Sequence, residues 1–298
     1  MTPRFELQGH RGARGLFPEN TLEGFAATCA LGVDTIELDV AVTADGVAMV
    51  THDPELNPDL TRGPDGAWLA RPGPAIRHLR AADLAGYDVG RLRPGSAYAA
   101  RYPAQTGRDG ARIPRLADVF AQTGRVRIDA EIKTLPDRPD LTVPPQTMAE
   151  AIVAVAAAAG ALDRLVVRSF DWRGLRHLRA HRPRVPLVWL TDAKTEAASR
   201  LWWDGVDPAE FGGSVPACIA AEAAEAAWRP VWAPEHGSLT EARLADAHAR
   251  GLRVLPWTVN EPADMARLIA WGVDGFCTDR PDLAHTAMRQ AGLAPPGG

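Results

Sequence analysis

The sequence predicts an α/β fold, a parallel (β/α)8 barrel of the TIM-barrel type. Short apolar segments of strand length alternate with helical patterns along the 298 residues, as expected for parallel strands joined by crossover helices. A single barrel commonly has about 250 residues and grows by insertions. We therefore expect one barrel domain over residues 1–298. The eight predicted barrel strands are residues 5–9, 35–40, 126–133, 165–170, 187–190, 231–233, 254–259 and 275–278.

The helices between these strands have recognisable ends. Asn20 and Glu23 have the spacing of a capping box, which predicts a helix start at Asn20. Gly32 is expected to end that helix, because glycine readily adopts the conformation found just beyond helix ends. Similar glycines follow three later helical patterns, at Gly160, Gly251 and Gly272.

An additional strand at residues 47–51 does not follow the alternation. Only Asp45-Gly46 separates it from the preceding apolar run, and such a dipeptide is typical of a two-residue hairpin turn. The segment should then lie antiparallel beside the second barrel strand. A two-residue turn would place residue 44 opposite residue 47, and hence Asp39 opposite His52 on one face.

Strand and helix patterns fade between residues 53 and 112, where proline and glycine recur. A connection of this length is usually functional. Because it follows the hairpin at one mouth of the barrel, we interpret residues 53–112 as an inserted lid.

Composition excludes several classes of function. The net charge of −4, with no run of Lys or Arg, offers no field for nucleic acid. Three widely spaced cysteines contain no C-x-x-C pair, which argues against a zinc or redox motif. No segment has the pattern of a signal peptide or a membrane span, so we expect no stable membrane insertion and a cytoplasmic location.

Glu37 and Asp39 lie two residues apart on a predicted strand and therefore share a face. Two carboxylates on a strand with apolar neighbours are costly unless a cation offsets their repulsion, and hard divalent cations prefer oxygen ligands. The pair is therefore a candidate metal site. The alternatives are a surface acidic pair or carboxylates bound to arginines.

Two histidines lie near the same predicted mouth. His10 directly follows the first strand, at the end where barrel active sites occur, and Arg11 beside it can donate two hydrogen bonds to a phosphate. His52 reaches the mouth if the hairpin pairs as predicted. The alternative for His52 is a residue that only caps local backbone near the turn.

Glu131 and Lys133 repeat the i, i+2 spacing on another strand. Glu131 is a candidate third metal ligand and Lys133 a candidate phosphate ligand, whereas a plain salt bridge along the strand explains the pair equally well. All but two of the 33 Lys and Arg residues are arginines, so a retained lysine suggests that a compact ammonium is required. Trp257, at the end of the seventh strand, could form an apolar wall of a substrate pocket.

Taken in order, these motifs resemble the glycerophosphodiester phosphodiesterase family. The resemblance extends from about Gln8 to Asp282, and it rests on His10-Arg11-Gly12, Pro18-Glu19-Asn20-Thr21, Glu37-Leu38-Asp39-Val40, Thr43-Ala44-Asp45-Gly46, His52-Asp53, Glu131-Ile132-Lys133, Ser169-Phe170, Trp257-Thr258-Val259-Asn260 and Thr278-Asp279-Arg280-Pro281. The resemblance implies that Glu37, Asp39 and Glu131 bind a divalent cation, Mg²⁺ or Ca²⁺. It further implies that His10 and His52 act as an acid–base pair and that Arg11 and Lys133 bind phosphate.

The expected activity is metal-dependent hydrolysis of glycerophosphodiesters to sn-glycerol 3-phosphate and an alcohol, with a small-molecule phosphodiester as the ligand. The alternatives are a phospholipase D-like activity on lysophospholipids and a catalytically silent barrel that binds phosphorylated ligands. The chain departs from the family pattern just after His52-Asp53, where it reads Glu55-Leu56-Asn57-Pro58-Asp59-Leu60-Thr61-Arg62-Gly63. The resemblance therefore does not extend to the lid residues or to the choice of alcohol.

Overall fold

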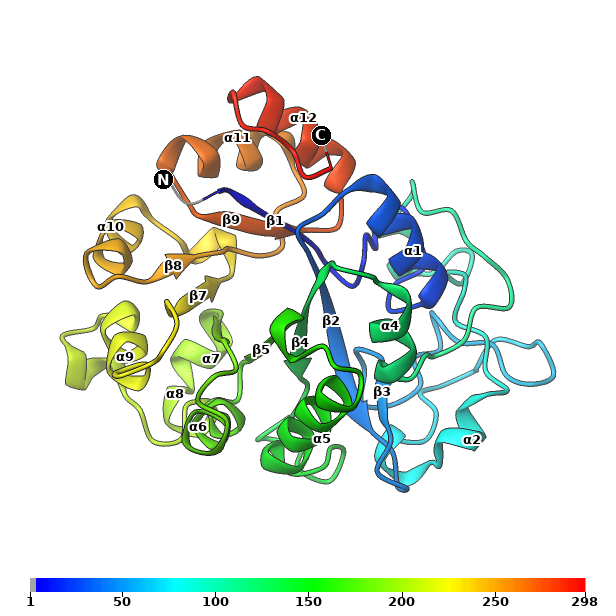
Figure 1. The fold of residues 1–298 in the computed structure, drawn as a ribbon. Coiled ribbons are helices and arrows are strands. Elements are labelled where there is room, and N and C mark those ends of the chain that lie inside the picture. Colours follow the sequence, from blue (N-terminus) through cyan, green and yellow to red (C-terminus); the bar gives the residue numbers. More distant parts are fainter. Residues whose placement is uncertain (1–3, 298) are drawn as a thin grey trace.

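The computed structural model describes residues 4–297 and contains a nearly closed barrel of eight parallel strands (Figure 1). The barrel order is β8-β7-β6-β5-β4-β2-β1-β9, and β3 pairs with β2 outside this path. The strands are β1 Glu6–Gly9, β2 Thr35–Val42, β3 Ala48–Val50, β4 Arg127–Ile132, β5 Leu165–Ser169, β6 Leu187–Thr191, β7 Val231–Pro234, β8 Arg253–Val254 and β9 Gly275–Thr278. The predicted α/β barrel is confirmed in this form.

The longer helices surround the barrel and cover its outer face (Figure 1). They are α1 Leu22–Leu31, α4 Leu116–Gln122, α5 Pro145–Ala158, α6 Trp172–His181, α9 Val215–Glu222, α10 Glu241–Ala249, α11 Pro262–Trp271 and α12 Pro281–Gln290. The short helices α7 Ala193–Ala197 and α8 Ser199–Trp202 follow β6. Single 3-10 turns lie at Leu162–Arg164, Pro208–Phe211 and His236–Ser238.

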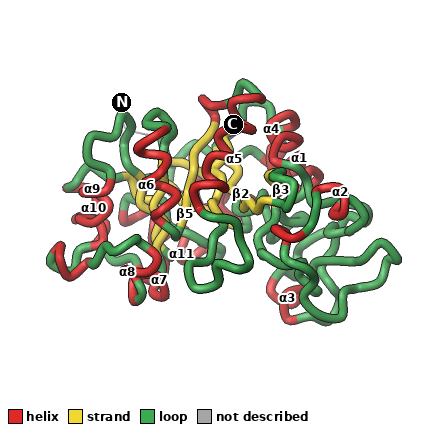
Figure 2. Tube along the Cα trace, turned by 90° about the horizontal axis from the view of Figure 1, so that it is seen from below, coloured by secondary structure: helices red, strands yellow, loops and turns green. Residues whose placement is uncertain are grey.

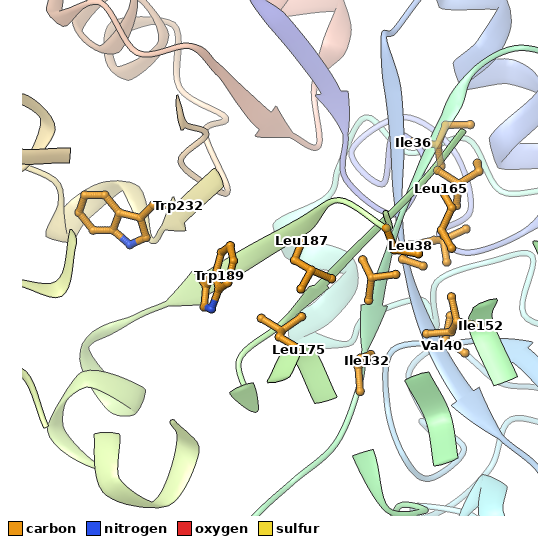
Figure 3. Close-up of a cluster of buried hydrophobic side chains, with 14 of the residues drawn as sticks. Ile36, Leu38, Val40, Ile132, Ile152, Leu165, Leu175, Leu187, Trp189 and Trp232 are labelled. Atoms are coloured by element: carbon orange, nitrogen blue, oxygen red, sulfur yellow. The ribbon is translucent and has the colours of Figure 1, made fainter. Parts of the chain in front are cut away.

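The main core lies between the strands and these helices. Alternate residues of β2, including Ile36, Leu38 and Val40, face outward and pack with side chains from α5 and α6, such as Ile152 and Leu175 (Figure 3). The intervening residues of β2 therefore face into the barrel, because strand side chains alternate between faces. This alternation sends Glu37 and Asp39 inward.

The inside of the barrel has two unlike halves. Polar side chains from β1, β2, β4 and β5 meet there, as shown by hydrogen bonds of Gln8 with Glu6 and Asp129. Arg168 of β5 donates to both Gln8 and Asp129. The opposite half, from β6 to β8, is apolar and consists of Val188, Leu190, Val231, Ala233 and Leu255.

The seventh predicted barrel strand is shorter than expected. Residues 254–259 were expected to be extended throughout, but β8 spans Arg253–Val254. Pro256 lacks the N–H that a regular ladder needs. The chain beyond β8 still contacts β9, because Cys277 N–H donates to Pro256 O at 2.9 Å and Val259 N–H donates to Cys277 O at 2.9 Å.

The hairpin forms as predicted, but in a different register. β3 is antiparallel to β2 with Val40 opposite Val50 and Val42 opposite Ala48. Thr43 N–H donates to Val47 O, so the loop has three residues, Ala44 to Gly46, and Gly46 has a positive φ of 78°. The prediction that Asp39 lies opposite His52 is therefore wrong. Thr51 N–H donates to Asp39 O, which leaves His52 one residue beyond the paired segment.

The first helix begins one residue later than predicted. Thr21, not Asn20, is the N-cap of α1 and accepts a hydrogen bond from Gly24 N–H. The Asn20–Glu23 capping box is therefore wrong. Gly32 does end α1, and Gly272 ends α11 with φ 85°.

Residues 53–112 form a mostly irregular insertion beside β3 (Figure 2). It contains a 3-10 turn at Ile76–His78 and the short helices α2 Ala81–Leu84 and α3 Ala97–Arg101. A small apolar cluster joins it to the barrel, with Leu56, Ile76 and Leu84 packing on Met49 and Ile113. In Figure 2, α3 lies at the same end of the molecule as α7 and α8, which follow the carboxyl end of β6.

Within residues 4–297, no helix has both the length and the apolar character needed to cross a membrane.

Candidate active site

A cavity of about 410 Å³ opens at the carboxyl ends of the barrel strands. Its walls include His10 after β1, Glu37 in β2, Glu131 in β4 and Trp257 after β8. The insertion contributes Asp53, Asn57, Tyr98 and Arg101 to the lining. This is the end of a barrel at which active sites are found.

Three buried carboxylates cluster at the cavity, and two of them, Glu37 and Glu131, line it. Glu37, Asp39 and Glu131 can each offer one oxygen within 4.8 Å of the others. They meet because β2 and β4 pair in parallel with Asp39 beside Glu131. Burial raises the pKa of Glu37, and the Asp39 carboxylate adds to that rise. Clustered acids of this kind fit a hard divalent cation, which prefers several oxygen ligands.

Two cations lie against this cluster. Lys133 Nζ is 2.9 Å from Glu131 Oε1 and 3.3 Å from Asp39 Oδ1. Although burial acts to raise the pKa of Asp39, Lys133 and Arg11 hold it well below its usual range. The salt bridge between Lys133 and Glu131, which was the alternative to a phosphate-binding role for Lys133, is present. Lys133 also lines the cavity.

Arg11 is held in an unusual position after β1. Its φ is 52°, in a region that non-glycine residues seldom adopt, and its N–H donates to Glu37 Oε2 at 2.9 Å. The guanidinium donates to Glu19 Oε1 at 2.7 Å. Arg11 Nε is buried and lies 3.2 Å from Asp39 Oδ2, yet it makes no aligned hydrogen bond within residues 4–297. Arg11 also lines the cavity, so its guanidinium borders the space that a ligand would occupy.

Each histidine of the cavity is bound through Nδ1 to a carboxylate. His10 Nδ1 is 2.7 Å from Asp279 Oδ1, and His52 Nδ1 is 2.8 Å from Asp53 Oδ1. Such a bond fixes the tautomer and leaves Nε2 of each ring for chemistry. Burial and the nearby Arg14 lower the pKa of His10 to about 4. Burial and Arg11 also lower the pKa of His52.

Asp279 and Asn20 contribute contacts that the sequence interpretation did not assign. Asp279 accepts hydrogen bonds from Arg14 Nε at 3.0 Å and from Asn260 Nδ2 at 2.8 Å, so it is fixed from two sides. Asn20, expected to cap a helix, instead donates through Nδ2 to Asp39 Oδ2 at 3.0 Å. Asp279 directly follows the last strand, and its position at a carboxyl strand end was the available signal.

Trp257 forms part of an apolar wall, in the position expected for it. Its ring meets Phe170 edge to face with 5.3 Å between centroids, and its Nε1–H donates to Ala233 O at 2.9 Å. Leu190 completes this wall of the cavity. All sequence-predicted site residues therefore lie at one mouth of the barrel. Asp39 does not line the cavity itself, but it belongs to the carboxylate cluster with Glu37 and Glu131.

The glycerophosphoryl diester phosphodiesterase family model matches residues 10–283, which includes the site and every barrel strand after β1. The chain belongs to this family. A glycerophosphodiester phosphodiesterase of Bacillus subtilis is 29% identical over 289 residues, covering 94% of this chain and 85% of that protein. The enzyme class expected from the motifs, a glycerophosphodiester phosphodiesterase, is therefore confirmed.

Solved structures share the fold of this chain. A putative glycerophosphoryl diester phosphodiesterase of Silicibacter pomeroyi has a TM-score of 0.87 and 33% identity, covering 99% of this chain and 96% of that one. An Oleispira antarctica phosphodiesterase, in complex with the product sn-glycerol-3-phosphate, has a TM-score of 0.67 and 21% identity, covering 95% of this chain and 96% of that one.

Proposed function

We propose that this enzyme hydrolyses glycerophosphodiesters to sn-glycerol 3-phosphate and an alcohol, with a divalent cation bound by Glu37, Asp39 and Glu131. The observation that carries the proposal is the buried cluster of three carboxylates within 4.8 Å of one another, beside two cations and two oriented histidines. The product named for the Oleispira protein belongs to the same reaction.

The phosphodiester group binds between Arg11 and Lys133. The Arg11 guanidinium and the Lys133 ammonium offer donors to its non-bridging oxygens. A divalent cation, when bound, adds charge stabilisation at these oxygens. Phe170, Leu190 and Trp257 cover the carbon skeleton on the other side and exclude water from it.

The two histidines transfer the protons of the displacement. His10 Nε2 accepts the proton of the attacking water or substrate hydroxyl as its oxygen bonds to phosphorus. His52, as the imidazolium with Nδ1–H on Asp53, donates its Nε2 proton to the alcohol oxygen as the bond from that oxygen to phosphorus breaks. Where a substrate hydroxyl attacks, water then opens the cyclic phosphate with the two histidines in exchanged roles. Asp279 and Asp53 orient the two rings through Nδ1. Each proton transfer contributes about 100-fold to 10,000-fold to a rate in comparable enzymes.

Residues 53–112 act as a lid within the single barrel domain in this proposal. Tyr98 and Arg101 of α3 and Asn57 line the cavity, so the insertion contacts a bound substrate. Tyr98 Oη donates a hydrogen bond to Glu19, which also binds Arg11. The lid is thereby connected to a residue that binds phosphate.

The test is a panel of glycerophosphodiesters assayed after chelator treatment and after return of Mg²⁺ or Ca²⁺. We expect the chelated enzyme to lose most activity and one of the cations to restore it. Glu131→Gln should remain inactive with either cation, while Asp192→Asn, a carboxylate change in the same cavity outside the cluster, should respond like the wild type. Full turnover by the chelated enzyme would refute the metal role. Release of choline from lysophosphatidylcholine, with no turnover of the glycerophosphodiesters, would favour the phospholipase D-like alternative.

A further inference from the structure

The wall of the cavity formed by the insertion is cationic and aromatic. Arg14 lies over the Tyr102 ring, with its guanidinium carbon 4.7 Å from the ring centroid. Arg101 lies 5.6 Å from the same centroid and 5.8 Å from that of Tyr98. These two tyrosines contact each other with centroids 5.3 Å apart. The aromatic pair therefore supports the Arg101 side chain at the edge of the cavity, since a guanidinium is attracted to aromatic faces.

Arg101 differs from the other cations of the cavity in having no acidic partner. The rest each contact a carboxylate: Arg11 with Asp39, Arg14 with Asp279, Lys133 with Glu131, and Arg168 with Asp129. Arg101 makes neither an ion pair nor a side-chain hydrogen bond with any residue between 4 and 297. Its charge is thus left for a ligand.

The position of Arg101 identifies the part of a ligand that it would contact. Lys133 Nζ lies 6.0 Å from the ring centroid of Phe170 in the apolar wall. Arg11 binds Glu19, which also accepts a hydrogen bond from Tyr98 of the insertion. The proposed phosphate site therefore borders both the apolar wall and the insertion wall that contains Arg101. If the glycerol carbons cover the apolar wall, the second alcohol of the diester faces the insertion. An anionic group on that alcohol would meet Arg101.

We propose that Arg101 is a specificity-determining residue that selects glycerophosphodiesters whose alcohol carries a further anionic group, either a carboxylate or a phosphate. The proposal rests on the proposed function, and it adds a second anion subsite to the one that holds the scissile phosphate. Planar guanidinium groups suit both kinds of anion, because they donate two parallel hydrogen bonds.

Pairs of substrates that differ by a single anionic group isolate the effect of Arg101 on substrate preference. Glycerophosphoserine and glycerophosphoethanolamine differ by one carboxylate, and glycerophosphoinositol 4-phosphate and glycerophosphoinositol differ by one phosphate. The wild type should have the higher kcat/KM for the anionic member of at least one pair. Arg101→Gln should reduce that preference about tenfold, as expected for one hydrogen-bonded charge at a partly exposed site, mainly through KM. Arg101→Lys should keep part of the preference.

The control is Arg71→Gln, which removes an exposed arginine of the same insertion away from the cavity. It should leave the preference unchanged. Calorimetric binding of the serine and ethanolamine diesters to the wild type and Arg101→Gln tests the subsite without turnover. Absence of turnover with a retained binding preference would refute the proposed function alone. An unchanged preference in Arg101→Gln, or an equal loss for both members of each pair, would refute the role of Arg101.

Discussion

Asp279 holds His10 by a 2.7 Å contact to Nδ1 and is itself held by Arg14 and Asn260. These contacts fix the Nδ1 side of the ring, while Nε2 lies 3.9 Å from Glu37 Oε2 of the carboxylate cluster. The contact joins residues 269 positions apart, so only the closure of the barrel brings them together. The partner of His52 is its neighbour Asp53, which Asn57 fixes in turn through a 2.6 Å hydrogen bond.

Asp279→Asn should therefore lower kcat by about 100-fold or more, because an amide no longer favours the tautomer that presents Nε2 as a base. Affinity for the cation and KM for a small generic diester should change little. Kinetics on bis(p-nitrophenyl) phosphate and a metal titration check this, with a melting curve to show that the protein is folded.

Asp192→Asn is the matched control, since Asp192 lines the cavity and caps α7 without contacting either histidine. It should keep most of the activity. Near-normal kcat in Asp279→Asn would show that His10 is oriented by other contacts, such as its neighbour Arg14.

At the scale of elements, the sequence of the hairpin predicts which residues share a face, but it does not predict the register between the two strands. The alternation of β2 correctly predicted a shared face for Glu37 and Asp39, because that depends only on strand geometry. The register depended on the turn length, and Thr43 closes a three-residue loop with its own hydroxyl accepting from Val47 N–H. Side-chain hydrogen bonding of this kind is not apparent from the Asp45-Gly46 dipeptide.

Gly46→Val should destabilise the protein by about 1–2 kcal/mol, the cost of placing a side chain in the left-handed region. The added Cβ itself meets no atom within 4 Å. Activity should fall only a few-fold, since His52 lies beyond the paired residues and Val50 N–H is also anchored to Pro114 O at 2.9 Å. Chemical denaturation and a kcat measurement test both parts.

Gly46→Asn provides the comparison, because asparagine tolerates positive φ better than valine. It should be more stable than Gly46→Val and equally active. A loss of activity in Gly46→Val as large as that of His52→Ala would show that the turn does position His52.

The ends of the strands and helices could likewise be predicted only where local side-chain and backbone effects do not shift them. Seven barrel strands were predicted to within two residues, because short strand-like segments alternate with helical patterns along the chain. β8 and the start of α1 were missed because a proline and a polar residue in a left-handed conformation changed the local backbone. The insertion was recognised by its lost periodicity, whereas the contacts of Tyr98 and Arg101 with the cavity depend on tertiary packing alone.

At the scale of the whole molecule, the end of the barrel opposite the site contains a buried charge. Burial alone would raise the pKa of Glu6, but Arg127 and Arg253 lower it from 4.5 to about 2. A carboxyl group whose pKa is lower in the folded state stabilises the fold above its unfolded value, and this stabilisation is lost as pH falls from about 4.5 to about 2. The shift corresponds to about 3 kcal/mol at neutral pH.

Glu6→Gln should consequently melt well below the wild type at pH 7, and the gap between the two should shrink as the pH approaches 3. Melting temperatures across this range measure it. Glu225→Gln, an exposed substitution, should follow the wild type at every pH. A gap that stayed constant down to pH 3 would mean that Glu6 acts through packing rather than charge.

Because the two halves of the barrel interior differ, the mouth of the barrel has a boundary between a polar surface and an apolar surface. Glu37, Asp129 and Arg168 lie below one side, while Leu190, Val231 and Leu255 lie below the other. A phosphodiester has the same division between its charged phosphorus centre and its carbon chain. In the proposed function, this division orients the diester, with its phosphate toward the polar half and its carbon skeleton toward the apolar half.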